Sequence, residues 1–387
     1  MRHLIFSPLM PPSRYGGIEI IVSKLAEALA VSDEVRVVSL NPQIAAVRER
    51  HAGAVHIIEL PGHFYSDLST DQANNVALDV LARLTTAAVD VVHCHDWFFA
   101  AASLVIARRL TSPLFGYFHT VKRREAEVLG LAVTPFRRFV QYRQERLAAA
   151  SERVVVYSDY MRWEVMRSLD VAVPKIVQFR CGPSLDADCG PAAARRSPRP
   201  GLTLLYVGRL APEKGVGILV EAFAGLRALG FPATLRVVGS GPMIIRLRAQ
   251  AAEAGVASWV TFEPFIQSAI LLGRAMADAD ILVMPSLFEP YGLVASEALC
   301  LGVPVVVSSD TGLAEVVGHG AYGEIFSSRS AADLLRALIT VARDPGTARV
   351  KAACGQRFHR DHQAWSRAAQ VIRDAYAGCA AESLAAS

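Results

Sequence analysis

Long apolar runs and paired cysteines are missing from this sequence, and each absence excludes a class of protein. No apolar run reaches the roughly 18 residues that a membrane-spanning helix needs, and the first 14 residues have too short an apolar core for a signal peptide. The six cysteines include no Cys-x-x-Cys pair, which argues against a structural zinc site or a disulfide framework. We therefore expect a cytoplasmic enzyme.

The common nucleotide motifs and strong net charge are missing as well. The loop at Gly16–Gly17 is not a Gly-x-Gly-x-x-Gly and no acidic residue ends the next strand, so the dinucleotide fingerprint is missing there, and the sequence contains no Gly-Lys-Ser/Thr P-loop. The formal charge of +4 is mild and does not call for a nucleic-acid partner. Lysine is scarce, with five against 35 arginines, which disfavours a phosphorylase that depends on a pyridoxal-phosphate lysine.

What is present is an alternation of short β-branched runs with amphipathic stretches such as 19–30 and 73–88, which predicts parallel sheets with helices on both faces. The strands expected in the first half are 4–7, 35–40, 55–60, 89–93, 114–118, 154–157 and 176–179. Those expected in the second half are 202–207, 234–238, 259–262, 281–284 and 303–307.

The alternation breaks once, in a segment rich in proline and arginine, and this break divides the chain. We expect an N-terminal Rossmann-like domain over 1–187 and a linker over 188–201. A C-terminal Rossmann-like domain follows over 202–361, and a helix within 362–387 packs back across the domains. Two doubly wound domains facing each other would share a cleft at their carboxyl strand ends.

The most informative stretch runs from Phe288 to Glu297. Pro290 and Gly292 place Glu289 on a loop, and 292–301 reads as a short helix that contains Glu297. The free backbone N–H groups at the start of that helix, at Gly292, Leu293 and Val294, form a natural seat for phosphate. Carboxylates on both sides predict a site for a sugar nucleotide.

Two glycine-bearing loops add to this site. Arg209 and Lys214 follow the 202–207 strand and lie in a loop between glycines, where Arg209 can grip two phosphate oxygens and Lys214 adds a point charge. Gly16 and Gly17 follow the first strand and open a helix, so the backbone there can approach a ligand closely. A plain tight turn explains this second loop equally well.

Histidines end two neighbouring strands: His93 and His95 end one, and His119 ends the next. Consecutive strand residues alternate faces, and a metal at His93 and His95 would need two more convergent ligands, so we expect no metal there. Buried structural histidines are one interpretation, and a contact from His119 to the reacting sugar is the other. The two Asp-x-Asp triplets, at 186–188 and 278–280, read as element boundaries rather than metal ligands.

Residues 122–146 form the most basic part of the N-terminal domain, with apolar residues interleaved. This pattern fits a surface that touches anionic lipid, but a solvated helix face is the favoured interpretation.

Taken together, these residues resemble the retaining glycosyltransferases of family 4, which have the two-domain GT-B fold. The resemblance runs from Gly16 to Phe326 and is strongest over 284–298, 302–305 and 311–317. By this resemblance, the domain over 1–187 is expected to bind the acceptor and the domain over 202–361 the nucleotide sugar. It implies that Arg209 and Lys214 hold the donor diphosphate, with the backbone of 292–294 on the phosphates and the Gly16–Gly17 loop closing over them.

The resemblance also implies roles for the acids and for one histidine. The position of Glu289 contacts donor-sugar hydroxyls near the reacting carbon, Glu297 binds ribose hydroxyls, and His119 lies close to the transferring sugar. We accordingly expect His119 and Glu289 to be catalytic. Because cations neutralise the leaving group, neither a metal nor another cofactor is required.

These inferences predict a retaining transfer of a hexose, with glucose or N-acetylglucosamine favoured, from a UDP-linked donor. The sequence is similar to aminocyclitol glycosyltransferases of aminoglycoside biosynthesis, which suggests a small polar acceptor such as 2-deoxystreptamine. A phosphatidylinositol-type mannosyltransferase using GDP-mannose is the alternative, and a sugar-nucleotide epimerase is a second enzymatic one. A non-catalytic protein that binds sugar nucleotides is the alternative of another class.

Overall fold

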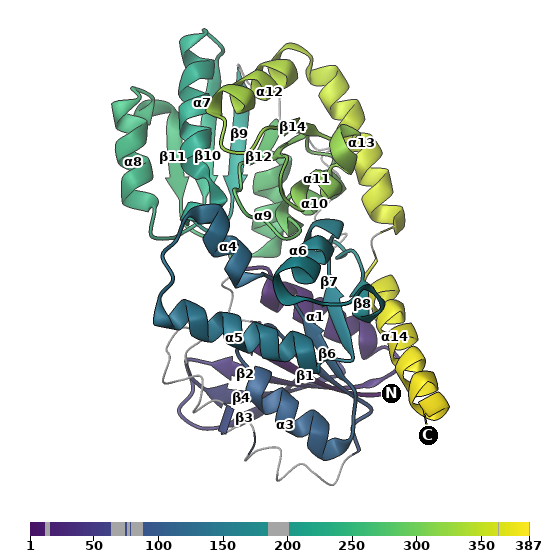
Figure 1. Ribbon diagram of the computed structural model, residues 1–387. Coiled ribbons are helices and arrows are strands. Elements are labelled where there is room, and N and C mark those ends of the chain that lie inside the picture. Colours follow the sequence, from purple (N-terminus) through teal and green to yellow (C-terminus); the bar gives the residue numbers. More distant parts are fainter. Residues whose placement is uncertain are drawn as a thin grey trace. The chain divides into compact units, whose positions relative to one another are not determined.

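A computed structural model describes residues 1–11, 16–62, 74–75, 78, 88–184, 201–362 and 364–386 (Figure 1). The chain forms two compact units: unit 1 is Met1–Cys181 with Ala364–Ser387, and unit 2 is Gly182–Gln363. The predicted linker and the predicted helix over 73–88 lie almost wholly outside the described residues. Within the described ranges, no helix is both long and apolar enough to cross a bilayer.

Unit 1 is built on an eight-stranded sheet in the order β3-β4-β2-β1-β5-β6-β7-β8. Its strands are β1 (Arg2–Leu9), β2 (Glu34–Asn41), β3 (Arg48–Ala52), β4 (Val55–Pro61), β5 (Val91–His95), β6 (Leu114–Tyr117), β7 (Arg153–Val156) and β8 (Ile176–Gln178). Its described helices of more than one turn are α1 (Ile18–Leu29), α3 (Ala100–Leu110), α4 (Lys122–Leu129), α5 (Pro135–Ala150), α6 (Asp159–Leu169) and α14 (Trp365–Ala386).

The central strands of unit 1 are apolar on both sides, as a sheet covered by helices on both faces requires. Consecutive residues such as Ile5 and Phe6 in β1, or Val37 and Val38 in β2, are all fully buried. The pairings among β1, β2, β4, β5, β6, β7 and β8 are parallel. The prediction of a parallel sheet is confirmed for these strands.

The edge strand β3 corrects that prediction, because it runs antiparallel to β4. Its sequence, Arg-Glu-Arg-His-Ala, has no apolar run from which a strand could be predicted. Ion pairs hold it instead: Arg48 and Arg50 both bond to Glu59 on β4, and the Arg50 Nε–Glu59 Oε1 distance is 2.9 Å. The Glu59 side chain is buried, so its charge depends on these two arginines.

Unit 2 is built on a six-stranded, all-parallel sheet in the order β11-β10-β9-β12-β13-β14. Its strands are β9 (Leu202–Val207), β10 (Ala233–Val238), β11 (Val260–Glu263), β12 (Ile281–Met284), β13 (Val305–Ser308) and β14 (Glu324–Phe326). Its described α-helices are α7 (Val216–Ala228), α8 (Ile244–Glu253), α9 (Ala269–Ala277), α10 (Leu293–Cys300), α11 (Leu313–Val316), α12 (Ala331–Arg343) and α13 (Pro345–His362).

The final helix returns to the first unit after the chain has completed the second. Helix α14 packs against α1 and buries Ala368, Ala369 and Ile372 (Figure 1). The Arg373 guanidinium donates to Asp33 at 2.7 Å, just beyond the end of α1. The predicted helix over 365–376 therefore exists, extends to Ala386, and belongs to unit 1.

Candidate active site

Each sheet has a point at which the strand order reverses, and in doubly wound folds ligands bind there, at the carboxyl ends of the strands. In unit 2 this point lies between β9 and β12, since the chain proceeds outward from β9 to β11 and then from β12 to β14. The loops that follow these two strands carry Arg209, Lys214, Glu289 and Gly292. The topology thus brings all four to one edge of one sheet.

The loop after β9 contains a single turn of 3-10 helix (Pro212–Lys214), and hydrogen bonds to its backbone carbonyl groups hold it in place. The Tyr206 hydroxyl donates to the Arg209 carbonyl at 2.7 Å, and the Leu287 N–H donates to the Glu213 carbonyl at 2.8 Å. Gly215 has a φ of 62°, and a Cβ there would lie 2.1 Å from the Pro285 carbonyl oxygen. The loops after β9 and β12 are therefore packed backbone against backbone.

The two cationic side chains at the carboxyl edge of the unit 2 sheet, Lys214 and Arg209, each form an ion pair. Lys214 Nζ lies 2.7 Å from Glu289 Oε2, and both side chains are less than one-fifth exposed. Arg209 pairs with Glu213 four residues on, and the Arg209 side chain is 48% exposed. Lys214 and Glu289, which are 75 residues apart in the chain, thus meet at one place, and the arginine beside them stays accessible.

Helix α10 begins at Gly292, as the sequence predicts, and its first N–H groups are available. Gly292 has a φ of 107°. A Cβ added there would lie 2.3 Å from Leu313 Cδ2. The Ala295 and Ser296 N–H groups donate to the Gly292 carbonyl. Within the described ranges, the N–H groups of Leu293 and Val294 have no hydrogen-bond acceptor. This is the arrangement that binds anions at helix starts.

Glu297 lies within α10 and is almost fully buried, at 3% exposure. Its carboxylate accepts a hydrogen bond from the Ser184 hydroxyl, a partner that sequence reasoning missed because 113 residues separate the two. Of the two acidic triplets, 186–188 lies outside the described residues. In the other, Asp278 ends α9 and Asp280 accepts from the Thr203 N–H at 2.9 Å, so both residues do mark element boundaries.

In unit 1 the strand order reverses between β1 and β5. Gly16 and Gly17 follow β1; the Gly16 N–H donates to the buried Glu19 carboxylate at 2.7 Å, and Gly17 is the residue before α1. A Cβ at Gly16 would meet nothing within 4 Å, so space is open beside that backbone. The neighbouring Tyr15 lies outside the described residues.

The histidines of unit 1 separate into two groups. His93 bonds to the Tyr117 hydroxyl at 2.8 Å and to His3 at 2.9 Å, and these contacts lie inside the sheet layer. His95 Nδ1 instead lies 3.0 Å from His119 Nε2, at the carboxyl edge. Among the described residues no cluster of three or more histidine, cysteine, aspartate or glutamate side chains could hold a metal ion.

Burial keeps these rings neutral. Desolvation lowers the pKa of His119 to about 3 and that of His95 well below its usual value.

The residue after His95, Asp96, has a φ of 64° and a buried carboxylate that accepts a hydrogen bond from the Gln144 amide at 2.8 Å. Sequence reasoning missed Asp96, although its position directly after His95 at a strand end was a usable signal.

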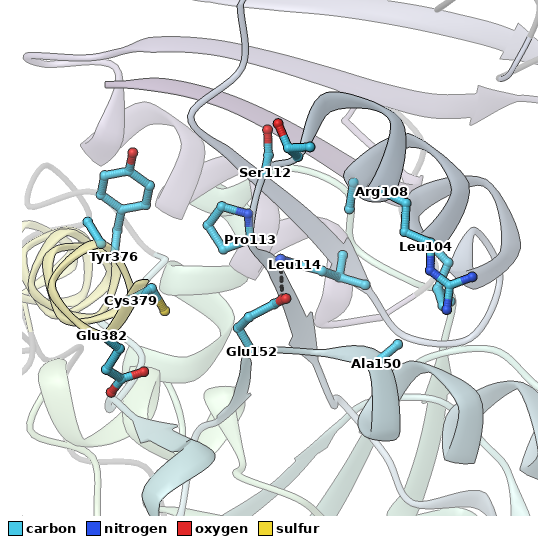
Figure 2. A pocket seen from close by; sticks show the side chains of 13 residues that line it. Leu104, Arg108, Ser112, Pro113, Leu114, Ala150, Glu152, Tyr376, Cys379 and Glu382 are labelled. Carbon is cyan, nitrogen blue, oxygen red and sulfur yellow. Dashed lines mark hydrogen bonds between the residues drawn. The ribbon is translucent and has the colours of Figure 1, made fainter. Parts of the chain in front are cut away.

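A cavity of about 720 Å³ lies elsewhere in unit 1 (Figure 2). Its lining includes Ser112 and Pro113 before β6, Glu152 before β7, and Cys379 of α14. The Glu152 carboxylate accepts from the Leu114 N–H at 2.6 Å, the bond drawn as a dashed line in Figure 2. These are the amino ends of the strands, opposite to the His119 edge, and no predicted site residue lines this cavity.

Comparison with known proteins agrees with the topology. A family model described as "Family 4 Glycosyltransferase in conflict systems" matches residues 11–380. Glycogen synthase of Mycobacterium tuberculosis is 34% identical over 291 residues, which cover 74% of this chain and 68% of the relative. D-inositol 3-phosphate glycosyltransferase of Pseudarthrobacter chlorophenolicus is 28% identical over 397 residues, which cover 96% of this chain and 92% of the relative.

Solved structures of the same architecture cover the whole chain. Sucrose-phosphate synthase of Thermosynechococcus elongatus has a TM-score of 0.81 at 21% identity, covering 98% of this chain and 99% of the other. Anabaena HepE, solved with UDP and glucose, has a TM-score of 0.74 at 16% identity, covering 98% of this chain and all of the other. The fold is that of the GT-B glycosyltransferases, and the chain belongs to glycosyltransferase family 4.

Proposed function

We propose that this glycosyltransferase moves a hexose, with retention, from a nucleoside-diphosphate sugar bound at the β9–β12 edge of unit 2 to a hydroxyl of a small polar acceptor. One observation carries the proposal: Lys214, on the loop after β9, pairs with Glu289 on the loop that leads directly into the open N–H groups of α10. A diphosphate needs cations and N–H donors, whereas a sugar needs carboxylates for its hydroxyls. This edge offers both.

The chemical task is to break the bond between the sugar's anomeric carbon and the phosphate oxygen. Negative charge develops on the leaving diphosphate, and Arg209, Lys214 and the start of α10 are fixed in advance to receive it. Glu289 orients the Lys214 ammonium in the free protein. When a diphosphate binds, Lys214 contacts a phosphate oxygen, and Glu289 becomes an acceptor for the sugar hydroxyls.

The configuration at the anomeric carbon is retained if the acceptor hydroxyl attacks that carbon from the same face from which the leaving diphosphate departs. A phosphate oxygen of the donor then takes the proton from the acceptor hydroxyl, so no carboxylate nucleophile and no metal is needed. In this scheme Glu297 binds the ribose hydroxyls, the Gly16–Gly17 loop contacts the phosphates, and His119 contacts the transferred sugar. Neutral His119 suits that last role, because burial keeps its pKa at about 3.

For the donor we favour UDP-glucose or UDP-N-acetylglucosamine, with HepE's complex with UDP and glucose in support. For the acceptor we favour a cyclitol such as 2-deoxystreptamine, in antibiotic biosynthesis. The D-inositol 3-phosphate glycosyltransferase named above supports this choice, since inositol is also a polyhydroxylated ring. A cytoplasmic location and independence of metal ions stay predictions.

Two alternatives lead to different observations. Mannosyl transfer from GDP-mannose to a phosphatidylinositol-type lipid requires a free basic surface over 122–146. Within that stretch, however, Lys122 pairs with Glu125, Arg123 with Glu127, and Arg124 with Glu164. A protein that only binds sugar nucleotides would bind them but release no sugar.

The test is a panel of nucleoside diphosphates and their sugars. We expect UDP to raise the melting temperature of the wild type and UDP-glucose or UDP-N-acetylglucosamine to be hydrolysed slowly without acceptor, equally well with EDTA. Lys214→Ala should abolish the thermal shift. Lys351→Ala is the matched control, because Lys351 forms the same kind of pair at the same 2.7 Å distance, with Glu324, at the amino end of β14.

The outcomes separate the alternatives. If only GDP raises the melting temperature and only GDP-mannose is hydrolysed, the lipid alternative is favoured. If a sugar nucleotide binds but is neither hydrolysed nor used for transfer, the non-catalytic alternative is favoured. If no nucleoside diphosphate stabilises the protein, or if Lys351→Ala weakens binding as much as Lys214→Ala, the assignment of this edge as the donor site is wrong.

A further inference from the structure

Three buried side chains from three neighbouring strands converge on one nitrogen atom of unit 1. His119 Nε2 lies 3.0 Å from His95 Nδ1 and 3.2 Å from the Tyr157 hydroxyl. His95 ends β5, while His119 and Tyr157 lie just beyond β6 and β7. All three side chains are less than one-tenth exposed.

The protons of this group can be placed by counting donors and acceptors. A neutral imidazole has one N–H donor and one acceptor nitrogen, and a tyrosine hydroxyl donates one proton. If the His95 proton is on Nδ1, both His95 and Tyr157 donate to the His119 Nε2 lone pair. Both donors that meet at His119 Nε2 are then satisfied, and His95 Nε2 keeps an unused lone pair. The His119 proton must then be on Nδ1.

The reverse arrangement satisfies fewer groups. If His119 carried its proton on Nε2, it would donate to His95 Nδ1, and the His95 proton would move to Nε2. That atom is buried without a hydrogen-bond partner among the described residues. The Tyr157 hydroxyl proton would also lose its acceptor. Buried donors without acceptors are rare in folded proteins and cost more than an unused lone pair.

We propose that His95 and Tyr157 are positioning residues that hold His119 as a single neutral tautomer, with its proton on Nδ1. This inference rests on the proposed function only for what His119 does: it meets the transferred sugar as a hydrogen-bond donor. With Nε2 occupied by two donors, His119 does not serve as a base. Its burial agrees, since desolvation keeps the ring uncharged over the physiological range.

The first test reads the tautomer directly and needs no substrate. Ring-nitrogen NMR shifts distinguish a protonated nitrogen from an unprotonated one, and His119→Gln identifies the signals of His119. We expect Nδ1 protonated and Nε2 unprotonated in the wild type. In the double variant His95→Leu with Tyr157→Phe, both donors are gone, and we expect the single tautomer to be replaced by a mixture in which Nε2 is protonated in part of the molecules. A wild type already protonated on Nε2 would overturn the proposal.

The second test separates positioning from packing. Tyr157→Phe removes one buried hydroxyl bonded to a histidine, and Tyr117→Phe makes the identical change one strand away, at His93. We expect Tyr157→Phe to lower kcat about tenfold, the equivalent of one hydrogen bond of ordinary net strength, with the KM for the donor little changed. Tyr117→Phe should leave kcat within about twofold, because its hydroxyl does not contact His119.

A conservative change at His95 completes the design. The amide nitrogen of asparagine lies near the position of Nδ1, so His95→Asn should retain activity that His95→Leu loses. If Tyr157→Phe and Tyr117→Phe lower kcat equally, or if His95→Asn is no more active than His95→Leu, then His95 and Tyr157 have only a structural role. If the chain transfers no sugar at all, the proposed function fails while the NMR result still decides the tautomer.

Discussion

The carboxyl edges of the two sheets differ in how their polar groups are satisfied. In unit 2 the groups are charged, partly exposed and paired across loops, as in Lys214 with Glu289. In unit 1 they are uncharged, buried and linked ring to ring, as in His95 with His119. The first arrangement suits a ligand that brings charge, since an ion pair can exchange partners. The second suits a ligand whose hydroxyls need donors at fixed positions.

The largest effect is expected when a positive charge is removed from the carboxyl edge of the unit 2 sheet. Lys214→Ala should lower kcat/KM by on the order of 100-fold or more, because a fixed donor to the developing charge is lost. Steady-state rates of transfer or of donor hydrolysis measure it. A loss below about threefold would mean that Lys214 does not face the leaving group.

The second effect concerns the backbone of the same edge. Gly292→Ala should lower the free energy of unfolding by about 3 kcal/mol or more, since the residue has a left-handed φ and its Cβ would overlap Leu313. Gly302→Ala is the matched control: its φ is 72°, but the nearest contact would be 3.5 Å away. Urea denaturation compares them, and equal losses would show that backbone strain alone matters at Gly292.

A smaller effect is expected from acid on unit 1. The folded-state pKa of His119 is about 3 and that of His3 about 4, both below the ordinary 6.5. As the pH falls from 7 to 6, the unfolded chain therefore takes up protons that the folded chain does not. The free energy of unfolding should fall by about 0.7 kcal/mol for each of these two histidines, about 1.4 kcal/mol together.

Thermal unfolding at a series of pH values measures this loss. The variant His119→Gln should lose less stability on acidification than the wild type, because one of the depressed groups is gone. Identical slopes for the two proteins would contradict the neutral, buried state of His119.

The smallest effect is expected on membranes. Because the described residues pair Lys122, Arg123 and Arg124 with acids, we expect little sedimentation with anionic vesicles at physiological salt. Neutral vesicles are the control. Sedimentation that is strong with anionic vesicles and decreases with added salt would favour the lipid alternative.

The sequence predicted much of the fold because buried parallel strands have an unambiguous pattern. The runs at 35–40, 55–60 and 281–284 agree with β2, β4 and β12 within a residue at each end. The strand predicted at 89–93 is displaced to Val91–His95, and the short β14 was missed. Strand β3 was beyond prediction, since its stability comes from Glu59 on another strand rather than from its own side chains.

The candidate site shows the same limit. The loop position of Glu289 and the helix start at Gly292 could be predicted, because proline and glycine act locally. The partners could not: Lys214 with Glu289 and Tyr157 with His119 are brought together only by the order of strands in their sheets, and Ser184 meets Glu297 from 113 residues away. Local residue patterns hold no information about which strand lies beside which.

The return of α14 to unit 1 has a consequence for synthesis on the ribosome. Unit 2 spans 182–363, so the chain must make all of it before Ala368, Ala369 and Ile372 can cover α1. At elongation speeds of about 5 to 20 residues per second, the apolar side of the first unit stays open to water for roughly ten to forty seconds. A nascent chain is thus exposed to aggregation in its first half while its second half is already able to fold.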